Sequence, residues 1–154
     1  MHAGSHSQMH YLHFAIMLLL SFIAMFVLMY AMVDRFENVY PNLNQAYMAG
    51  LMVAPMAVIE MALMSAMYPN KRLNMAIIVV GILALAFFWF VIRAQTAISD
   101  KSFLRSMIPH HAGAILMCDQ APIRDPQIRE LCGKILKSQQ AEIAEMKAIL
   151  QRLD

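Results

Sequence analysis

The sequence has little charge, and the shortage is greatest in its first 92 residues. Of all 154 residues, 14% are Asp, Glu, Lys or Arg and 60% are hydrophobic. This composition excludes a disordered chain and indicates that lipid is part of the solvent. A formal net charge of +2 is too small for a strongly basic surface, so we expect no nucleic-acid partner. The charged residues of the first 92 positions are Asp34, Arg35, Glu37, Glu60, Lys71 and Arg72.

The sequence also lacks the patterns that mark common enzymes. It has no phosphate-binding loop and no recognisable set of nucleophile, base and orienting residue, so we expect no catalytic activity. The residues before the first apolar run contain no Lys or Arg, and no small-residue cleavage site follows that run. We therefore do not interpret the run as a cleavable signal peptide.

Three apolar runs are long enough to cross a bilayer, which needs about 20 helical residues. They cover 11–33, 46–67 and 74–92, and only the second contains a charge, Glu60. The sequence therefore predicts an all-α protein with a membrane domain over 11–93. A His- and Met-containing tail over 1–10 precedes this domain, and a helical hairpin over 99–154 follows it.

The charges flanking the runs do not decide the orientation in the membrane. Lys71 and Arg72 favour a cytoplasmic loop between the second and third runs, whereas Arg93, Lys101 and Arg105 favour a cytoplasmic hairpin. A domain that folds by itself crosses the membrane despite its charges, so both orientations stay open at this point.

Methionines recur every four residues in the apolar half, and another residue occasionally takes a methionine's place in the series. In the second run this series is Met48, Met52, Met56, Glu60 and Met64. Residues four apart share a helix face, so the run presents a stripe of thioethers. The stripe has two interpretations: flexible packing side chains, or a pathway of soft ligands for Cu(I). Glu60 favours the pathway, because a carboxylate within a span usually serves a function.

The N-terminal tail contains His2, His6 and His10, which share a face if the tail is helical. Histidine-rich tails collect metal ions. The alternative is a polar cap on the first span.

The last third of the chain changes to an amphipathic pattern. Ser99 is placed to cap a first helix, residues 119–126 interrupt it with two prolines, and Asp125-Pro126 is a typical start for a second helix. Two helices are too few to bury a complete core. Pairing two hairpins from separate chains would complete a four-helix bundle, so we expect a homodimer.

The stretch 106-SMIPHHAGAILMC-118 contains the main candidate site. Its donors Met107, His110, His111 and Met117 lie on roughly one face if the stretch is helical. Imidazole binds copper, zinc and iron, but thioether favours copper. We expect copper, as Cu(I) or Cu(II), with iron or zinc less well suited. Ordinary buried histidines are the alternative.

These residues resemble a bacterial family catalogued as domain of unknown function 305. The resemblance rests on Asp100, Phe103, 107-MIPHH-111, 114-AILM-117, Ile135, Gln139, Glu142, Ile143 and Met146. It implies a ferritin-like helical bundle, export from the cytoplasm, and copper binding linked to copper tolerance. It further implies that His110, His111, Met107, Met117 and Met146 are ligands. Independently of the resemblance, Gln139 and Glu142 interrupt or border the apolar face of the second helix, which makes them candidates for a secondary metal site. Export implies an N-terminus in the cytoplasm and a hairpin in the periplasm of a bacterial inner-membrane protein.

Cys118 and Cys132 flank the expected turn of the hairpin. In an oxidising compartment they would form a disulfide. Two alternatives stay open: thiol ligands for the metal, or two unpaired buried cysteines.

The sequence thus predicts a membrane-anchored copper-binding protein, with two alternatives. The first is a copper transporter, since three spans and a Met-x3-Met pattern are similar to the eukaryotic high-affinity copper uptake family, which forms trimers. A trimer is accordingly our second expectation for the oligomer. The other alternative is a structural assembly protein without metal.

Overall fold

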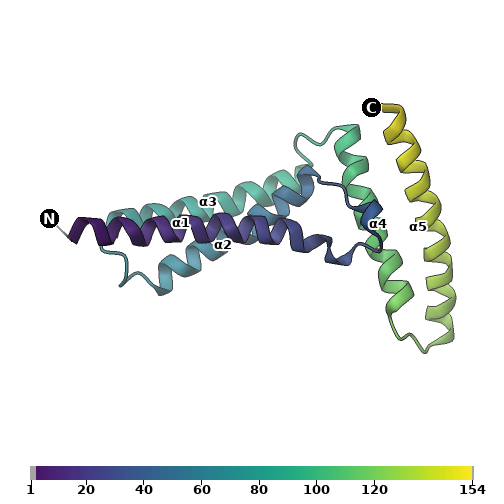
Figure 1. Ribbon diagram of the computed structural model, residues 1–154, viewed down its shortest axis with the longest axis horizontal. Helices are drawn as coiled ribbons and strands as arrows, with labels where there is room; N and C mark the ends of the chain where they lie inside the picture. The colour runs from purple at the N-terminus through teal and green to yellow at the C-terminus, as the bar shows by residue number, and fades with distance from the viewer. Residues whose placement is uncertain (1–2, 154) are drawn as a thin grey trace. The chain divides into compact units, whose positions relative to one another are not determined.

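The protein is α-helical throughout the part described by its computed structural model (Figure 1). The model describes the backbone of residues 3–153 and the side chains of residues 9–153. The elements are α1 (Ala3–Leu28), the short 3-10 helices η1 (Met29–Met32) and η2 (Phe36–Asn38), α2 (Leu43–Leu63), α3 (Lys71–Ala94), α4 (Asp100–Gln120) and α5 (Pro126–Leu153). No strand occurs within this range, which confirms the predicted all-α class.

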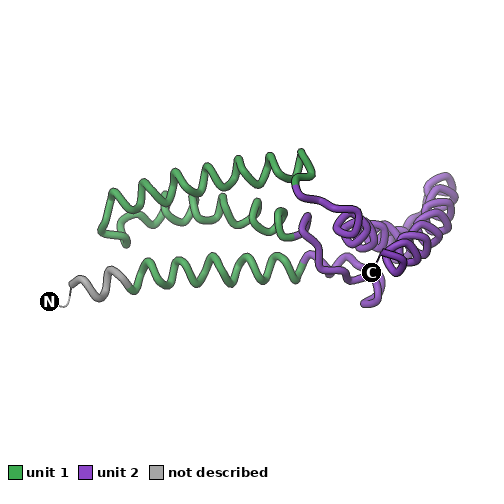
Figure 2. The backbone as a smooth tube through the Cα atoms, turned by 90° about the horizontal axis from the view of Figure 1, so that it is seen from above, with its two compact units in different colours: residues 1–28, 46–96 green, residues 29–45, 97–154 purple. Residues whose placement is uncertain are grey.

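The chain forms two units, which Figure 2 shows in different colours. Unit 1 comprises Met1–Leu28 and Ala46–Thr96, and unit 2 comprises Met29–Gln45 and Ala97–Asp154. The spans predicted for 11–93 thus make up most of unit 1. Residues 29–45, which the sequence analysis assigned to the membrane domain, group with the hairpin instead.

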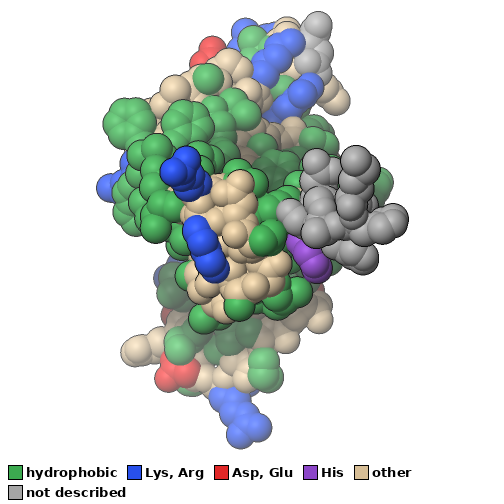
Figure 3. Space-filling view, turned by 90° about the vertical axis from the view of Figure 1, so that its left-hand side faces the viewer, with side chains coloured by type: hydrophobic (Ala, Val, Ile, Leu, Met, Phe, Trp, Pro, Cys, Tyr) green, Lys and Arg blue, Asp and Glu red, His purple; other side chains and the backbone are tan. Residues whose placement is uncertain are grey.

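Three helices of the described chain are long and apolar enough to cross a membrane, as predicted. They are Met9–Met32, Leu43–Leu63 and Lys71–Ala94. Large apolar side chains point outward from them, for example Leu19, Leu20 and Val80, which are 60, 60 and 64% exposed. Figure 3, which faces the left-hand side of Figure 1, shows hydrophobic side chains on that face together with a few Lys and Arg. Apolar side chains that point outward match a hydrocarbon solvent.

Two of the spans begin earlier than the hydrophobic runs predicted, because asparagines cap them. The second starts at Leu43, where the Asn42 side chain accepts a hydrogen bond from the Gln45 amide at 2.9 Å. The third starts after Asn70, whose side chain accepts one from the Leu73 amide at 3.1 Å. Such caps satisfy amides that lack a partner inside the helix. Lys71 therefore lies in the first turn of α3 and not in a loop.

Helices α2 and α3 approach each other closely at Gly81. A Cβ atom at this position would lie 2.7 Å from Val58 Cγ2 and 3.4 Å from the Ala54 carbonyl oxygen. Small residues allow this approach between membrane helices, where van der Waals packing replaces the hydrophobic effect.

Unit 2 is built around the antiparallel hairpin of α4 and α5 (Figure 1). Both predicted starts are confirmed. The Ser99 side chain accepts a hydrogen bond from the Ser102 amide at 3.3 Å, and Asp125 accepts from the Gln127 and Ile128 amides at 2.9 and 3.0 Å. Helix α4 continues through Pro109.

The residues between α1 and α2 complete the core of this hairpin. Val33 and Tyr40 pack against the cluster that α4 and α5 form. The Asn44 amide donates a hydrogen bond to the Ser106 hydroxyl at 3.3 Å. A Cβ atom on Gly113 would lie 3.5 Å from the Met32 carbonyl oxygen, so α4 runs close to the last residue of η1.

Candidate metal centre in the helical hairpin

The apolar core of the hairpin fixes the register of the two helices. From α4 it contains Leu104, Ile108, Ala112 and Ile115, and from α5 Ile143 and Leu150, all at most 7% exposed. Ile108 and Ala112 are fully buried. Side chains bordering this core are held in place by the packed helices, which is what a binding site requires.

His111 lies at the margin of this core and is 8% exposed. Its Nδ1 atom lies 2.9 Å from the Met107 carbonyl oxygen, one helical turn earlier. Its Nε2 atom lies 2.8 Å from Oε2 of Glu142 on α5. Both ring nitrogens therefore have a partner, and the imidazole is held in one orientation.

The two partners determine what the His111 ring can do. A carbonyl oxygen only accepts hydrogen bonds, so Nδ1 carries a proton. When Nε2 is also protonated, it donates a hydrogen bond to the Glu142 carboxylate; without that proton, its lone pair can bind a metal ion. Histidine ligands of metals typically have their second nitrogen bound to a carbonyl in this way.

Glu142 is held in its ionised form by two neighbours. The Ser138 hydroxyl donates a hydrogen bond to Oε1 at 2.5 Å, and His111 binds the other oxygen. These bonds hold the pKa of Glu142 below its usual value, and the bond from Ser138 has the larger effect. Burial raises the pKa by a smaller amount. An ionised carboxylate beside a ring nitrogen is a suitable pair of ligands for a cation.

Met107 and Met146 lie at one level of the hairpin, one turn from this pair. Met107 precedes His111 by four residues, and Met146 follows Glu142 by four. Because the helices are antiparallel, both steps lead in the same direction along the hairpin. Both methionines are half-buried, and Met146 packs against the apolar core.

The other predicted ligands of the hairpin lie apart from this group. His110 is exposed, and its ring centre is 6.1 Å from that of His111. Met117 is 53% exposed and six residues beyond His111, or about 9 Å along the helix. Gln139 is half-buried, one turn from Glu142 on the same helix. The structure therefore brings His111 and Glu142 together and separates them from His110 and Met117.

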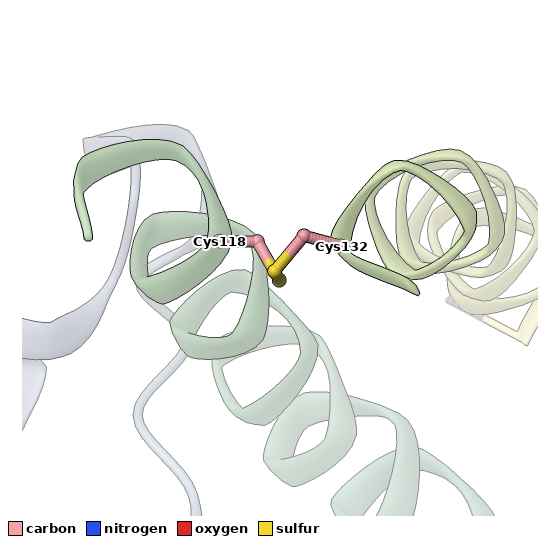
Figure 4. The surroundings of a disulfide bond; sticks show 2 residues. All are labelled: Cys118 and Cys132. Carbon is pink, nitrogen blue, oxygen red and sulfur yellow. A yellow bond between two sulfur atoms is a disulfide. The ribbon is translucent and has the colours of Figure 1, made fainter. Parts of the chain in front are cut away.

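Cys118 and Cys132 are joined by a disulfide near the turn of the hairpin (Figure 4). Their Cα atoms are 5.3 Å apart, and 14 positions separate them in the sequence. In this state the sulfurs link α4 to α5 and are not thiolate ligands.

The candidate pathway residues of unit 1 are not gathered around a common centre. Met48, Met52 and Met64 are 38, 42 and 38% exposed on the outside of the helices, and Met56 is half-buried. Glu60 lies near the end of α2, where it accepts a hydrogen bond from the Tyr68 hydroxyl at 3.4 Å.

The N-terminal histidines are described only in part. The His10 ring lies edge-on to Tyr68, with ring centres 6.4 Å apart. His2 and the His6 side chain lie outside the described residues. Over the described residues, no group of three or more His, Cys, Asp or Glu side chains is placed to hold a metal ion. A metal at His111 and Glu142 would therefore need thioethers or a second chain to complete its ligands.

Ser138 is a contact that the sequence analysis missed. Its position four residues before Glu142 was a signal, because residues at this spacing meet on a helix surface. The partnership with His111 was less visible, because 31 residues separate the two along the chain.

Two comparisons with known proteins found relatives of this chain. The family model Domain of unknown function (DUF305) matches residues 91–152, which contain α4 and α5 almost entirely. The uncharacterized protein L153 of Acanthamoeba polyphaga mimivirus is 36% identical over 141 residues, covering 87% of this chain and 91% of that protein. This similarity extends well beyond the matched domain into the helices of unit 1. No solved structure matches the chain.

Proposed function

This chain belongs to the Domain of unknown function (DUF305) family, and from that premise we propose that it is a membrane-anchored copper-binding protein. It would handle copper or contribute to copper tolerance through its helical hairpin. The observation that carries the proposal is the pairing of His111 Nε2 with the Glu142 carboxylate at 2.8 Å, while Nδ1 is held by a backbone carbonyl.

The neighbouring side chains support copper over harder metals. The pair itself supplies one nitrogen and one oxygen donor, and the side chains one turn away on each helix are the thioethers of Met107 and Met146. Thioethers select copper, Cu(I) in particular, over zinc and iron. We assign Glu142 to the ligand set. His110 and Met117 would bind metal only at a site that a second chain helps to form.

A second copy of the chain is the partner that we propose for the exposed side of the hairpin. Met117, Ile128 and Leu131 are 53, 49 and 55% exposed near the disulfide end. Covering these side chains with another hairpin would remove apolar surface from water and place His110 near a partner helix. The dimer is our first expectation and the trimer our second.

The disulfide supports the proposed orientation, with the N-terminus in the cytoplasm and the hairpin on the oxidising side. Disulfides persist in compartments such as the bacterial periplasm and are rare in the cytosol. For a bacterial inner membrane this side is the periplasm.

Copper affinity of the purified full-length chain tests the proposal. A colorimetric Cu(I) chelator competes with the protein in detergent, and the retained copper gives the dissociation constant. Met146→Leu conserves side-chain volume, so a loss of affinity reports a lost ligand and not a lost fold. We expect at least a tenfold loss for Met146→Leu and for Glu142→Gln.

Matched controls distinguish the hairpin from other histidines and methionines. His13→Gln replaces an exposed histidine of α1, and Met75→Leu an exposed methionine of α3. Both should bind copper like the unmodified protein. Copper affinity in Met146→Leu, Glu142→Gln and His111→Asn equal to that of the unmodified protein would overturn the hairpin site. No copper binding by the unmodified protein would favour the structural assembly protein.

A further inference from the structure

A hollow of unit 2 has no role in the copper proposal. It has a volume of about 270 Å³ and lies between the 34–38 turn and the middle of α5. Its apolar lining includes Ile115 and Ile143 of the hairpin core. The remaining lining residues are Asp34, Arg35, Glu37, Asn38, Gln140, Ala144 and Lys147.

The hollow contains two charges that have no partner among the described residues. Asp34 is engaged already, because it accepts a hydrogen bond from Asn38 at 2.6 Å and lies 3.8 Å from Arg35. By contrast, Glu37 and Lys147 make no ion pair or side-chain hydrogen bond with any other described residue. One carboxylate and one ammonium group thus line the same hollow, and the described part of the chain offers neither a partner.

This mixture of charges selects the kind of ligand. A simple cation would meet Arg35 and Lys147, and a simple anion would meet Asp34 and Glu37. A ligand with an ammonium group and a phosphate satisfies both signs through charge-assisted hydrogen bonds. No aromatic residue lines the hollow, so it lacks the cage that quaternary ammonium groups require. A primary ammonium group, with N–H donors for the carboxylates, fits better.

The hollow also lies close to the membrane along the chain. Its residues 34–38 begin two positions after Met32, where the first candidate span ends. The six residues from Val33 to Asn38 reach at most about 22 Å when extended, so the turn stays close to the bilayer's interfacial region. Phe36, within the same turn, is 89% exposed. An aromatic side chain exposed at this depth is stabilised by lipid.

We propose that this hollow binds the headgroup of a phospholipid with a primary ammonium group, of the phosphatidylethanolamine class. Lys147 binds the phosphate and Glu37 the ammonium group, while Phe36 contacts the adjoining acyl region. The bound lipid would hold the hairpin's unit at the membrane surface.

Titration calorimetry of the full-length, delipidated protein in detergent tests this assignment. The probe is dihexanoyl phosphatidylethanolamine. The same lipid with a choline headgroup lacks N–H donors, and that with a glycerol headgroup lacks the cation. We expect the ethanolamine lipid to bind at least tenfold more tightly than either. Soluble phosphoethanolamine and inorganic phosphate are measured in parallel, and both should bind more weakly than the lipid.

Variants at the two unpaired charges complete the test. Glu37→Gln and Lys147→Gln should each weaken binding of the ethanolamine lipid about tenfold, the usual effect of losing a charged hydrogen bond. Lys147→Arg, which keeps the charge, should bind the lipid within a few-fold of the unmodified protein. The controls Glu145→Gln and Lys137→Gln alter exposed charges of α5 outside the hollow and should change nothing.

Several results would overturn the proposal. These are equal affinity for the choline or glycerol lipid, unchanged affinity in both Glu37→Gln and Lys147→Gln, or no binding at all. Phosphoethanolamine binding as tightly as the lipid would overturn the assignment to a membrane lipid. The comparison of lipids on the unmodified protein decides the matter even if a variant fails to fold.

Discussion

His111 and Glu142 connect the two helices of the hairpin through a contact of 2.8 Å at the margin of the apolar core. The histidine is nearly buried, whereas the Glu142 side chain is 47% exposed. The pair therefore has one fixed member and one that faces solvent, and a metal ion can reach it from the carboxylate side.

The first prediction concerns the pH dependence of stability. Glu142 has a lower pKa in the folded protein than in the unfolded chain, so its contribution is complete above the unfolded value of about 4.3. That contribution is lost as the pH falls through the folded value. The thermal unfolding midpoint should therefore fall on acidification, and Glu142→Gln should reduce this fall.

Thermal unfolding of the full-length chain between pH 3 and pH 7 provides the measurement. The control is Glu145→Gln. Glu145 lies three residues further along α5 and makes no hydrogen bond to Ser138 or His111, so this variant should keep the pH profile of the unmodified protein. Identical profiles for the two variants would show that the Glu142 contacts do not contribute.

The second prediction concerns the Cys118–Cys132 disulfide. It closes a loop of 14 positions, and a loop of this length is expected to stabilise the fold by about 3 kcal/mol. Reduction should lower the denaturant midpoint of the hairpin, and Cys118→Ser/Cys132→Ser should lower it equally. Alkylation of the native protein followed by mass analysis checks the bond directly, since two alkylated thiols would exclude it.

The third prediction compares two helical glycines. Gly81→Ala places a Cβ atom 2.7 Å from the stiff Val58 side chain, so α2 and α3 must move apart at a cost of about 1–3 kcal/mol. Gly133→Ala meets no atom within 4 Å and should stabilise α5 by up to about 1 kcal/mol. Unfolding in detergent should give shifts of opposite sign. A stabilising Gly81→Ala would contradict the close packing.

The fourth prediction concerns copper movement. Met48, Met52 and Met64 face outward in the single chain, so one copy does not enclose a path lined by them. We expect copper flux into proteoliposomes to equal that into empty liposomes, and Met52→Leu to change nothing. Flux that falls in Met52→Leu or Glu60→Gln, but not in Met75→Leu, would favour the transporter.

Local patterns predicted the helices of this protein better than its contacts. Apolar length gave the three spans, and Ser99 and Asp125 marked the starts of α4 and α5, because these signals lie within a few adjacent residues. The early starts after Asn42 and Asn70 were missed, since a hydropathy run does not register a capping side chain.

The site was predicted less completely, for a physical reason. The spacing of the donors around 107-MIPHH-111 identified a helix face, but helical spacing does not say which histidine faces the core. Burial by α5 decides that for His111 and leaves His110 exposed. Packing of Val33 and Tyr40 on the hairpin depends on contacts between segments far apart in the chain, which no periodic pattern reports.

The assignment of residues 29–45 to the hairpin's unit has a mechanical consequence. The chain passes between the two units three times, after Leu28, after Gln45 and after Thr96. A pull on the hairpin is therefore shared by α1, α2 and α3 and not carried by one tether. Cutting the chain near residue 93 would separate the hairpin from Val33 and Tyr40 and expose the part of its core that they cover.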